Sequence, residues 1–164
     1  MASLVVAVLL TVTPASAASA IASTPEAALT APIRCTPISR GEVESLFERW
    51  NAALASGDPT RVAALYSDDA LLLPTLSNRA RETPEAIRDY FEGFLARKPR
   101  GRIDHRQIRL GCNAALDAGT YSFELSSPDG APPAWVQARY TFAYVYGPDG
   151  WRIQHHHSSL MPAN

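Results

Sequence analysis

The carboxy-terminal segment of the chain concentrates the side chains that could do chemistry. Three of the four histidines stand in a row at 155–157, and two serines follow them directly. The segment 151–159 has the pattern of a β-strand, in which successive side chains point to opposite faces of the sheet. Trp151 and Ile153 are expected to face the core. His155, His157 and Ser159 are therefore predicted to face the same interior.

Three interpretations of this histidine run are open on spacing alone. His155 and His157 on one strand face could supply two ligands to one metal ion, with His105 or a carboxylate as a third. Alternatively, the imidazoles and hydroxyls bind and convert a polar substrate without a metal. In the third interpretation the histidines are structural, placed in the core, at an interface or on the surface.

Three further polar residues occur in apolar surroundings. Thr75 follows an apolar stretch and a proline, and is either a site residue or a plain turn residue. Tyr90 lies on the apolar stripe of a predicted helix, where a buried hydroxyl usually finds a partner, or where the ring simply fills the core. Arg139 stands inside an apolar strand, where a charge needs a partner or a ligand, a salt bridge at a subunit interface being the alternative.

Three helices are predicted to support this site. Ser39 and Glu42 have the spacing of a capping box, and Gly57 ends the helix that they start. The dipeptides Asp58-Pro59 and Thr83-Pro84 each combine a capping residue with proline at the first helical position. The apolar positions of the short second helix are Val62, Ala63, Leu65 and Tyr66.

The remaining elements are predicted to be strands. A short apolar strand at 70–75 is assigned to a sheet edge because it contains Pro74. Beyond Pro99 the apolar period changes from about 3.6 to 2, which predicts strands at 103–111, 114–126, 135–146 and 151–159. Helices followed by a meander indicate an α+β fold, with a strongly curved antiparallel sheet wrapped over the helices. Its concave interior is a natural place for a small-molecule site.

Composition excludes several classes of function. The chain has 164 residues, 46% hydrophobic and 19% charged, with a formal net charge of −1. It has no run of Lys and Arg, so a nucleic-acid partner is not expected. The two cysteines are too far apart for a CxxC motif. No glycine-rich phosphate loop or G-x-S-x-G elbow occurs.

The amino terminus is interpreted as a secretory signal peptide at 1–20. It carries no charged side chain, and an apolar run at 4–12 is followed by small residues that suit a signal peptidase. That run is too short to span a hydrocarbon core of about 30 Å. An apolar terminus on a cytosolic protein is the alternative. Residues 21–37 would then be a linker and 38–164 the folded domain of a secreted or periplasmic protein, without membrane attachment after cleavage. In that compartment Cys35 and Cys112 either pair or remain separate thiols.

Many of these residues also follow the order of a known family. The chain resembles, over about 39–162, the bacterial calcium/calmodulin-dependent protein kinase II association-domain-like family. Its terminal His-His-His-Ser-Ser-x-Met-Pro resembles the signature of the iota-class carbonic anhydrases within that family. The residues that carry the likeness are Trp50, Gly57, Asp58, Ala63, Leu65, Tyr66, Asp69, Ala70, Leu73, Pro74, Thr75, Arg81, Thr83, Pro84, Tyr90, Phe91, the run 139–142, Gly150, Trp151 and the run 155–162.

The resemblance implies a nuclear transport factor 2-like cone that forms homodimers or larger homo-oligomers. It also implies a lyase, carbonate dehydratase, that hydrates carbon dioxide reversibly to bicarbonate and a proton. By position its catalytic residues would be Thr75, Tyr90, His157 and Ser159.

Four further residues are expected to bind substrate. Arg139 matches a pocket arginine of the kinase association domain, and Tyr121 falls near another pocket position. His155 and Ser158 complete this set, on the same carboxy-terminal strand.

The expected chemistry uses no metal, with zinc or manganese as the alternatives. A neutral imidazole, that of His157, is the expected general base, because an ordinary phenol is rarely ionised at neutral pH. A non-catalytic ligand-binding or oligomerisation module is the alternative function. An isomerase or cyclase is a third, for which Asp68 and Asp69 are the nearest carboxylates.

Overall fold

The computed structural model describes residues 34–127 and 129–163. The predicted signal peptide and most of the predicted linker therefore lie outside the described residues. The described elements are α1 (Arg40–Ala55), α2 (Pro59–Ala63), β1 (Tyr66–Leu73), α3 (Pro84–Leu95), β2 (Arg100–Leu110), β3 (Ala114–Leu125), β4 (Ala134–Gly147) and β5 (Gly150–Leu160). In the described part of the chain, no helix is long and apolar enough to cross a bilayer.

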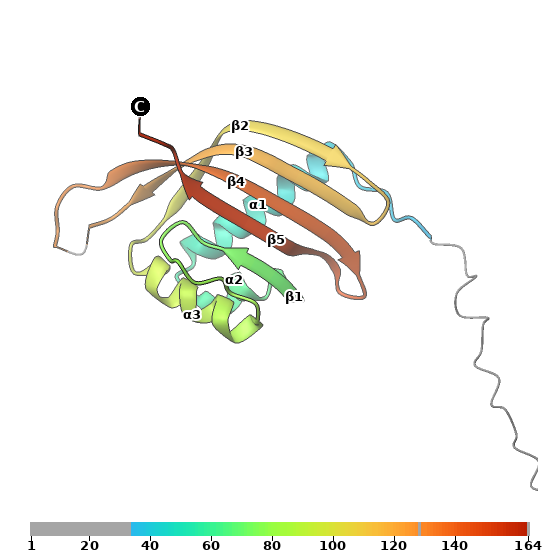
Figure 1. The fold of residues 1–164 in the computed structure, drawn as a ribbon, viewed down its shortest axis with the longest axis horizontal. Helices are drawn as coiled ribbons and strands as arrows, with labels where there is room; N and C mark the ends of the chain where they lie inside the picture. The colour runs from blue at the N-terminus through green and yellow to red at the C-terminus, as the bar shows by residue number, and fades with distance from the viewer. Residues whose placement is uncertain (1–33, 128, 164) are drawn as a thin grey trace, which may run out of the picture. The chain divides into compact units, whose positions relative to one another are not determined.

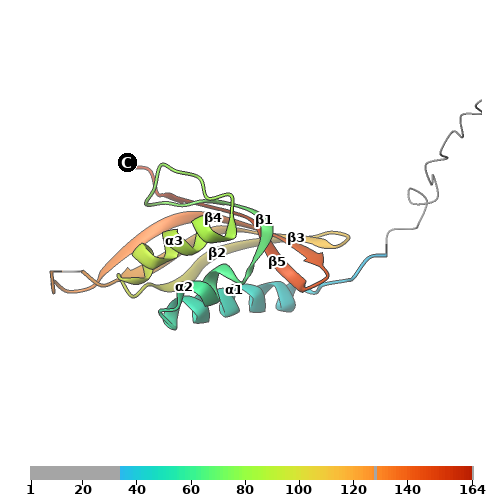
Figure 2. The same ribbon diagram turned by 90° about the horizontal axis from the view of Figure 1, so that it is seen from below.

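The five strands form one sheet in the order β1-β5-β4-β3-β2 (Figure 1). The run from β2 to β5 is the predicted antiparallel meander. The prediction of a wholly antiparallel sheet is wrong at one edge, because β1 pairs with β5 in parallel. As Pro74 predicted, β1 is an edge strand. Figure 2 shows α1 and α2 on one side of this sheet, which we call the inner face.

The three helices begin at the capping residues that the sequence predicted. Ser39 and Glu42 make the reciprocal capping box of α1. The Asp58 and Thr83 side chains accept hydrogen bonds from the first turns of α2 and α3. One boundary is wrong: Tyr66 begins β1 instead of ending the second helix. Its ring is buried, and its hydroxyl bonds to groups on α1 and β5, so tertiary contacts decide its conformation.

The core lies between the inner face and α1, and aromatic rings fill it. Trp50 is 1% exposed and sits at the centre. Its ring packs edge-on against the rings of Phe91, Phe123 and Phe142, which come from α3, β3 and β4. These contacts hold α3 and the meander in a fixed relation, as a binding site on the inner face requires.

A β-bulge in β5 decides which residues face this core. Ile153 pairs with Tyr144, and His155 pairs with the next β4 residue, Ala143, so Gln154 is an extra residue without its own β4 partner. An extra residue of this kind reverses the alternation beyond it. Ile153, His156 and Ser158 are buried, whereas the neighbouring side chains are more exposed.

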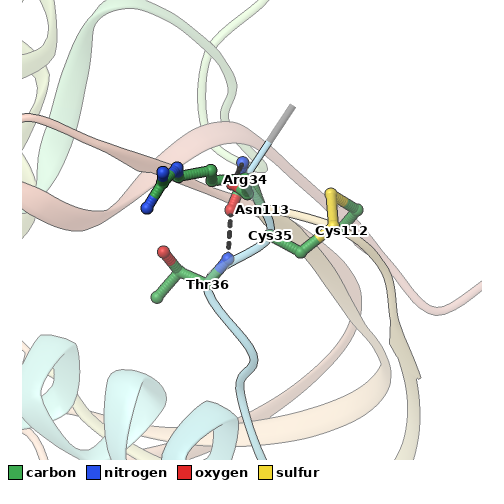
Figure 3. Close-up of a disulfide and its surroundings, with 5 residues drawn as sticks. All are labelled: Arg34, Cys35, Thr36, Cys112 and Asn113. Atoms are coloured by element: carbon green, nitrogen blue, oxygen red, sulfur yellow. Dashed lines mark hydrogen bonds between the residues drawn. A yellow bond between two sulfur atoms is a disulfide. The ribbon is translucent and has the colours of Figure 1, made fainter. Parts of the chain in front are cut away.

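The two cysteines form a disulfide between the segment before α1 and the β2–β3 turn (Figure 3). Asn113 reinforces the link: its Oδ1 accepts from the Thr36 amide at 2.7 Å, and its Nδ2 donates to the Arg34 carbonyl at 2.9 Å. Cys35 and Cys112 are therefore bonded to each other and are not separate thiols.

Candidate functional site

A small cavity of about 40 Å³ opens between the inner face, α3 and the turn after β1. Its wall is mostly apolar, from Trp50, Leu72, Pro74, Leu76, Phe91, Phe94, Phe123, Leu125, Val136 and Ala138. Its five polar lining residues are Thr75, Tyr90, Tyr121, His156 and Ser158. Since about 10–15 Å³ suffices for one water, the cavity suits molecules of a few heavy atoms.

His156 is held rigidly by its neighbours. It is 3% exposed, stacks on Phe142 with ring centroids 4.0 Å apart, and meets the Trp50 ring edge-on at 5.3 Å. Burial, with smaller contributions from the two neighbouring histidines, lowers the pKa of His156 to about 3. The imidazole is therefore neutral at physiological pH.

The hydrogen-bond chain to His156 identifies which ring nitrogen carries the proton. Trp50 Nε1, which can only donate, lies 3.1 Å from the Tyr66 hydroxyl oxygen, and that oxygen lies 2.8 Å from His156 Nδ1. The phenol satisfies both neighbours by accepting from Trp50 and donating to Nδ1. The reverse arrangement would leave a fully buried phenol hydrogen without an acceptor, which is costly. We therefore assign the hydrogen of the neutral ring to Nε2.

His156 Nε2 is the atom left for a ligand. It is buried and has no hydrogen-bond partner among the described residues. Nδ1 is occupied by Tyr66, which does not line the cavity. Nε2–H is thus a fixed neutral donor, unpaired until something polar occupies the cavity.

Three hydroxyls form a second polar group. Tyr121, 1% exposed, donates to Ser158 Oγ at 2.5 Å, and Thr75 Oγ1 is also hydrogen-bonded to Ser158 Oγ. Each hydroxyl has one hydrogen. Tyr121 donates its hydrogen to Ser158, and a second hydrogen forms the bond between Ser158 and Thr75. One hydrogen of the Ser158–Thr75 pair is left to point elsewhere.

Tyr90 contributes the remaining phenol. Burial raises its pKa to about 12, although the Leu76 backbone amide and the nearby Arg81 charge act in the opposite direction. The Arg81 guanidinium carbon lies 5.9 Å from the centre of the Tyr90 ring. Burial also raises the pKa of Tyr121. Both phenols therefore stay protonated and act as donors.

The structure brings four of the predicted residues together: Thr75, Tyr90, Tyr121 and Ser158. The predicted facing of His157 and Ser159 is wrong. The Gln154 bulge turns them to the outer face, where His157 pairs with Thr141 of β4.

His155 and Arg139 also lie on the outer face. Arg139 is exposed and sits opposite Ser159 in the β4–β5 ladder. His156, absent from the predicted site, takes the place expected for His157. No residue type in 151–159 marks the bulge, and either register would have offered an imidazole to the interior.

The described side chains do not form a metal-binding site. Across 34–127 and 129–163, no three His, Cys, Asp or Glu residues lie close enough to hold one ion. His155 and His157 share the outer face, away from the cavity, and the one cavity nitrogen free for a ligand carries a hydrogen.

The carboxylates considered for isomerase chemistry also lie elsewhere. Asp68 and Asp69 are exposed on β1 and line a separate open groove of about 730 Å³. The residues that line the small cavity include no Asp or Glu.

Residues 39–162 match the model of the calcium/calmodulin-dependent protein kinase II association domain. The chain belongs to this family. It is also similar to a structure from Xanthomonas campestris assigned to the same domain, with 44% identity and a TM-score of 0.73, over 82% of this chain and 100% of that one. A search of curated proteins finds no match.

More distant structures show the same fold. A nuclear transport factor 2-like protein from Salmonella enterica is 21% identical, with a TM-score of 0.65 over 76% of this chain and 91% of that one. A protein from Streptomyces avermitilis, assigned as a dehydratase of the same fold family, is 15% identical, with a TM-score of 0.65 over 75% and 96%. The chain therefore has the nuclear transport factor 2-like α+β fold that was predicted.

Proposed function

We propose that the cavity hydrates carbon dioxide reversibly, so that the chain acts as a carbonic anhydrase. The observation that carries this proposal is the composition of the cavity: an apolar wall with neutral hydrogen-bond donors and no carboxylate among its lining residues. Carbon dioxide is small and apolar, whereas bicarbonate is a small planar anion. The wall suits the first and the donors suit the second.

The donors would act on the charge that develops during the reaction. As water adds to carbon dioxide, negative charge grows on the two carbon dioxide oxygens. His156 Nε2–H is held in place by packing before substrate arrives, and the spare hydrogen of the Thr75–Ser158 pair and the Tyr90 hydroxyl belong to groups that line the same cavity. Donors organised in advance stabilise such charge without reorganisation, and one donor is commonly worth about 10²–10³ in rate.

The cavity contains no group that could act as the general base, and His157, the expected base, lies outside it. The overall reaction is CO₂ + H₂O → HCO₃⁻ + H⁺, so the attacking water must lose a proton. His157 does not reach the cavity, and His156 has its basic nitrogen occupied by Tyr66. The two phenols are protonated. The proton must therefore leave the cavity.

The test is stopped-flow carbon dioxide hydration by the purified chain and two matched variants. Ser158→Ala removes an inner hydroxyl and is expected to lower kcat/KM about 10²-fold, as loss of one donor does. Ser159→Ala removes a hydroxyl from the next residue on the outer face and should retain the wild-type rate. A wild-type protein without activity above the buffer rate, before and after addition of zinc or manganese, would refute the proposal.

A second candidate is an assembly module, in which the outer face of the sheet meets a second copy of the chain. The family description names association. The exposed large apolar side chains include Leu116 and Trp135, at 37% and 56% exposure. Both belong to the outer-facing sets of β3 and β4 by strand alternation. Sedimentation analysis tests this: a homodimer or larger species is expected, and a monomer at micromolar concentration would contradict it.

We also propose a secreted or periplasmic location. The disulfide supports it, because such bonds persist in oxidising compartments. Detection of the mature chain, shortened at its amino terminus, in a periplasmic or culture fraction is the expected result.

A further inference from the structure

The proposed hydration reaction leaves one proton in a cavity that cannot keep it. The one imidazole there is buried, with Nδ1 bonded to Tyr66. The other polar groups are hydroxyls, which can pass a proton on but do not hold one. A route to solvent is therefore required, and the hydroxyl pair Thr75–Ser158 is the place to search for it.

Strand β1 does not extend beside this pair, and we call the place beyond its last residue the opening. β1 ends at Leu73, which pairs with His157, so β1 offers no partner to Ser158. Pro74 and Thr75 turn into the space instead, and Thr75 Oγ1 bonds to Ser158 Oγ. Beyond Leu73, β5 is therefore the edge of the sheet, and Thr75 lies beside its Ser158.

A depression of about 110 Å³ lies beside this opening, lined by Leu73, Pro74, Ser77, Asn78, Arg79, Ala80, His157 and Ser158. Two of these residues, Pro74 and Ser158, line the inner cavity as well. The depression is large enough for several waters, at about 10–15 Å³ for each. It also contains His157, an exposed imidazole with no hydrogen-bond partner in the described part of the chain.

We propose that His157 transfers the proton between the Thr75–Ser158 hydroxyl pair and bulk solvent. This inference rests on the proposed hydration of carbon dioxide. The attacking water gives its proton to Ser158 Oγ, the hydroxyl of the pair that lines both the cavity and the depression, and Ser158 passes one hydrogen to water in the depression, so that it again carries a single hydrogen. The proton then reaches a neutral nitrogen of His157 and finally the buffer, while bicarbonate leaves the cavity. Histidine suits this role because its charge changes between about pH 5 and 8.

The groups around His157 leave its imidazole without an ion-pair partner. Arg79 lines the same depression, His155 lies two residues away on the same face, and Arg139 sits opposite the adjacent Ser159. Neither Asp nor Glu is among the residues that line the depression. No salt bridge to a residue of this lining therefore occupies the His157 ring.

The test compares His157→Ala with His105→Ala in stopped-flow hydration at low and high imidazole concentration. His105 is an exposed outer-face histidine on β2, distant in sequence from the depression. For His157→Ala at low buffer we expect kcat to fall about 10²-fold, the low end for a positioned proton-transfer group. kcat/KM should change little, because the addition step itself is untouched. Added imidazole should restore kcat, whereas His105→Ala should match the wild type throughout.

The outcomes separate the two proposals. A wild type that hydrates carbon dioxide, with a His157→Ala variant equal to it at every buffer concentration, overturns the role of His157 alone. Equal losses of kcat and kcat/KM that imidazole does not restore also overturn it, because they indicate a structural effect. A wild type that is inactive, before and after addition of zinc or manganese, overturns hydration itself and this inference with it.

Discussion

His156 links the cavity to the pH dependence of folding. Its pKa is about 3 in the folded chain, against an ordinary value of 6.5, so the unfolded chain binds the proton more tightly. The associated stability is fully present above pH 6.5 and is lost as the pH falls towards 3. At about 1.4 kcal/mol per pH unit, the loss between pH 6.5 and about pH 4.5 is on the order of 2–3 kcal/mol.

Urea unfolding at these two pH values checks this contribution. His156→Gln cannot be protonated, so its free energy of unfolding should fall less over the same interval, by that amount. His105→Gln, at an exposed site, should follow the wild type. Parallel pH curves for wild type and His156→Gln would show that the imidazole is not buried as the structure places it.

The facing of the carboxy-terminal histidines and serines depends on contacts that the sequence does not reveal. The chemistry of the carboxy-terminal run was predictable, since a His and a Ser do face the cavity. The sequence did not predict which His and which Ser these are, because one extra residue, Gln154, reverses the facing of the β5 residues that follow it. The bulge depends on pairing with β1 and β4, which lie far away in the sequence. Thr75 and Tyr90 lie outside β5, so the bulge does not change their facing, and both line the cavity.

At the scale of elements, local signals predicted most of the fold. Capping residues located the helix starts, and period-2 patterning located β2 to β5 to within about three residues. The failures were at Tyr66 and in the parallel β1–β5 pair. Both depend on contacts between distant segments, which neither propensity nor periodicity contains.

The β2–β3 pair requires a glycine at 119. A Cβ there would overlap the His105 carbonyl oxygen, next to the point where the register shifts between Ile103 and His105. Gly119→Ala should therefore push the two strands apart and cost about 1–3 kcal/mol, as overpacking does. Gly93→Ala on α3 is the matched control, since nothing lies within 4 Å of its added Cβ. That change should stabilise the chain by about 0.5–1 kcal/mol. Thermal unfolding of both variants separates the effect of steric overlap from the general effect of replacing glycine by alanine. Equal melting temperatures would contradict the predicted overlap at residue 119.

At the scale of the whole molecule, the disulfide ties the start of the folded chain to the far end of the meander sheet. Cys35 and Cys112 are 77 residues apart, and the loop they close contains α1, α2, β1, α3 and β2. Closing a loop of that length removes chain entropy from the unfolded state worth about 4.5 kcal/mol in the loop-entropy treatment. Cys35→Ser/Cys112→Ser should therefore lower the free energy of unfolding by about 2–4 kcal/mol.

Urea unfolding with and without a reductant measures this effect. Reductant should destabilise the wild type by the same amount and leave the double variant unchanged, because both then lack the same cross-link. Neither cysteine lines the cavity, so its chemistry should survive reduction wherever the chain is still folded. Wild-type protein that loses no stability on reduction would show that the two thiols are not bridged in solution.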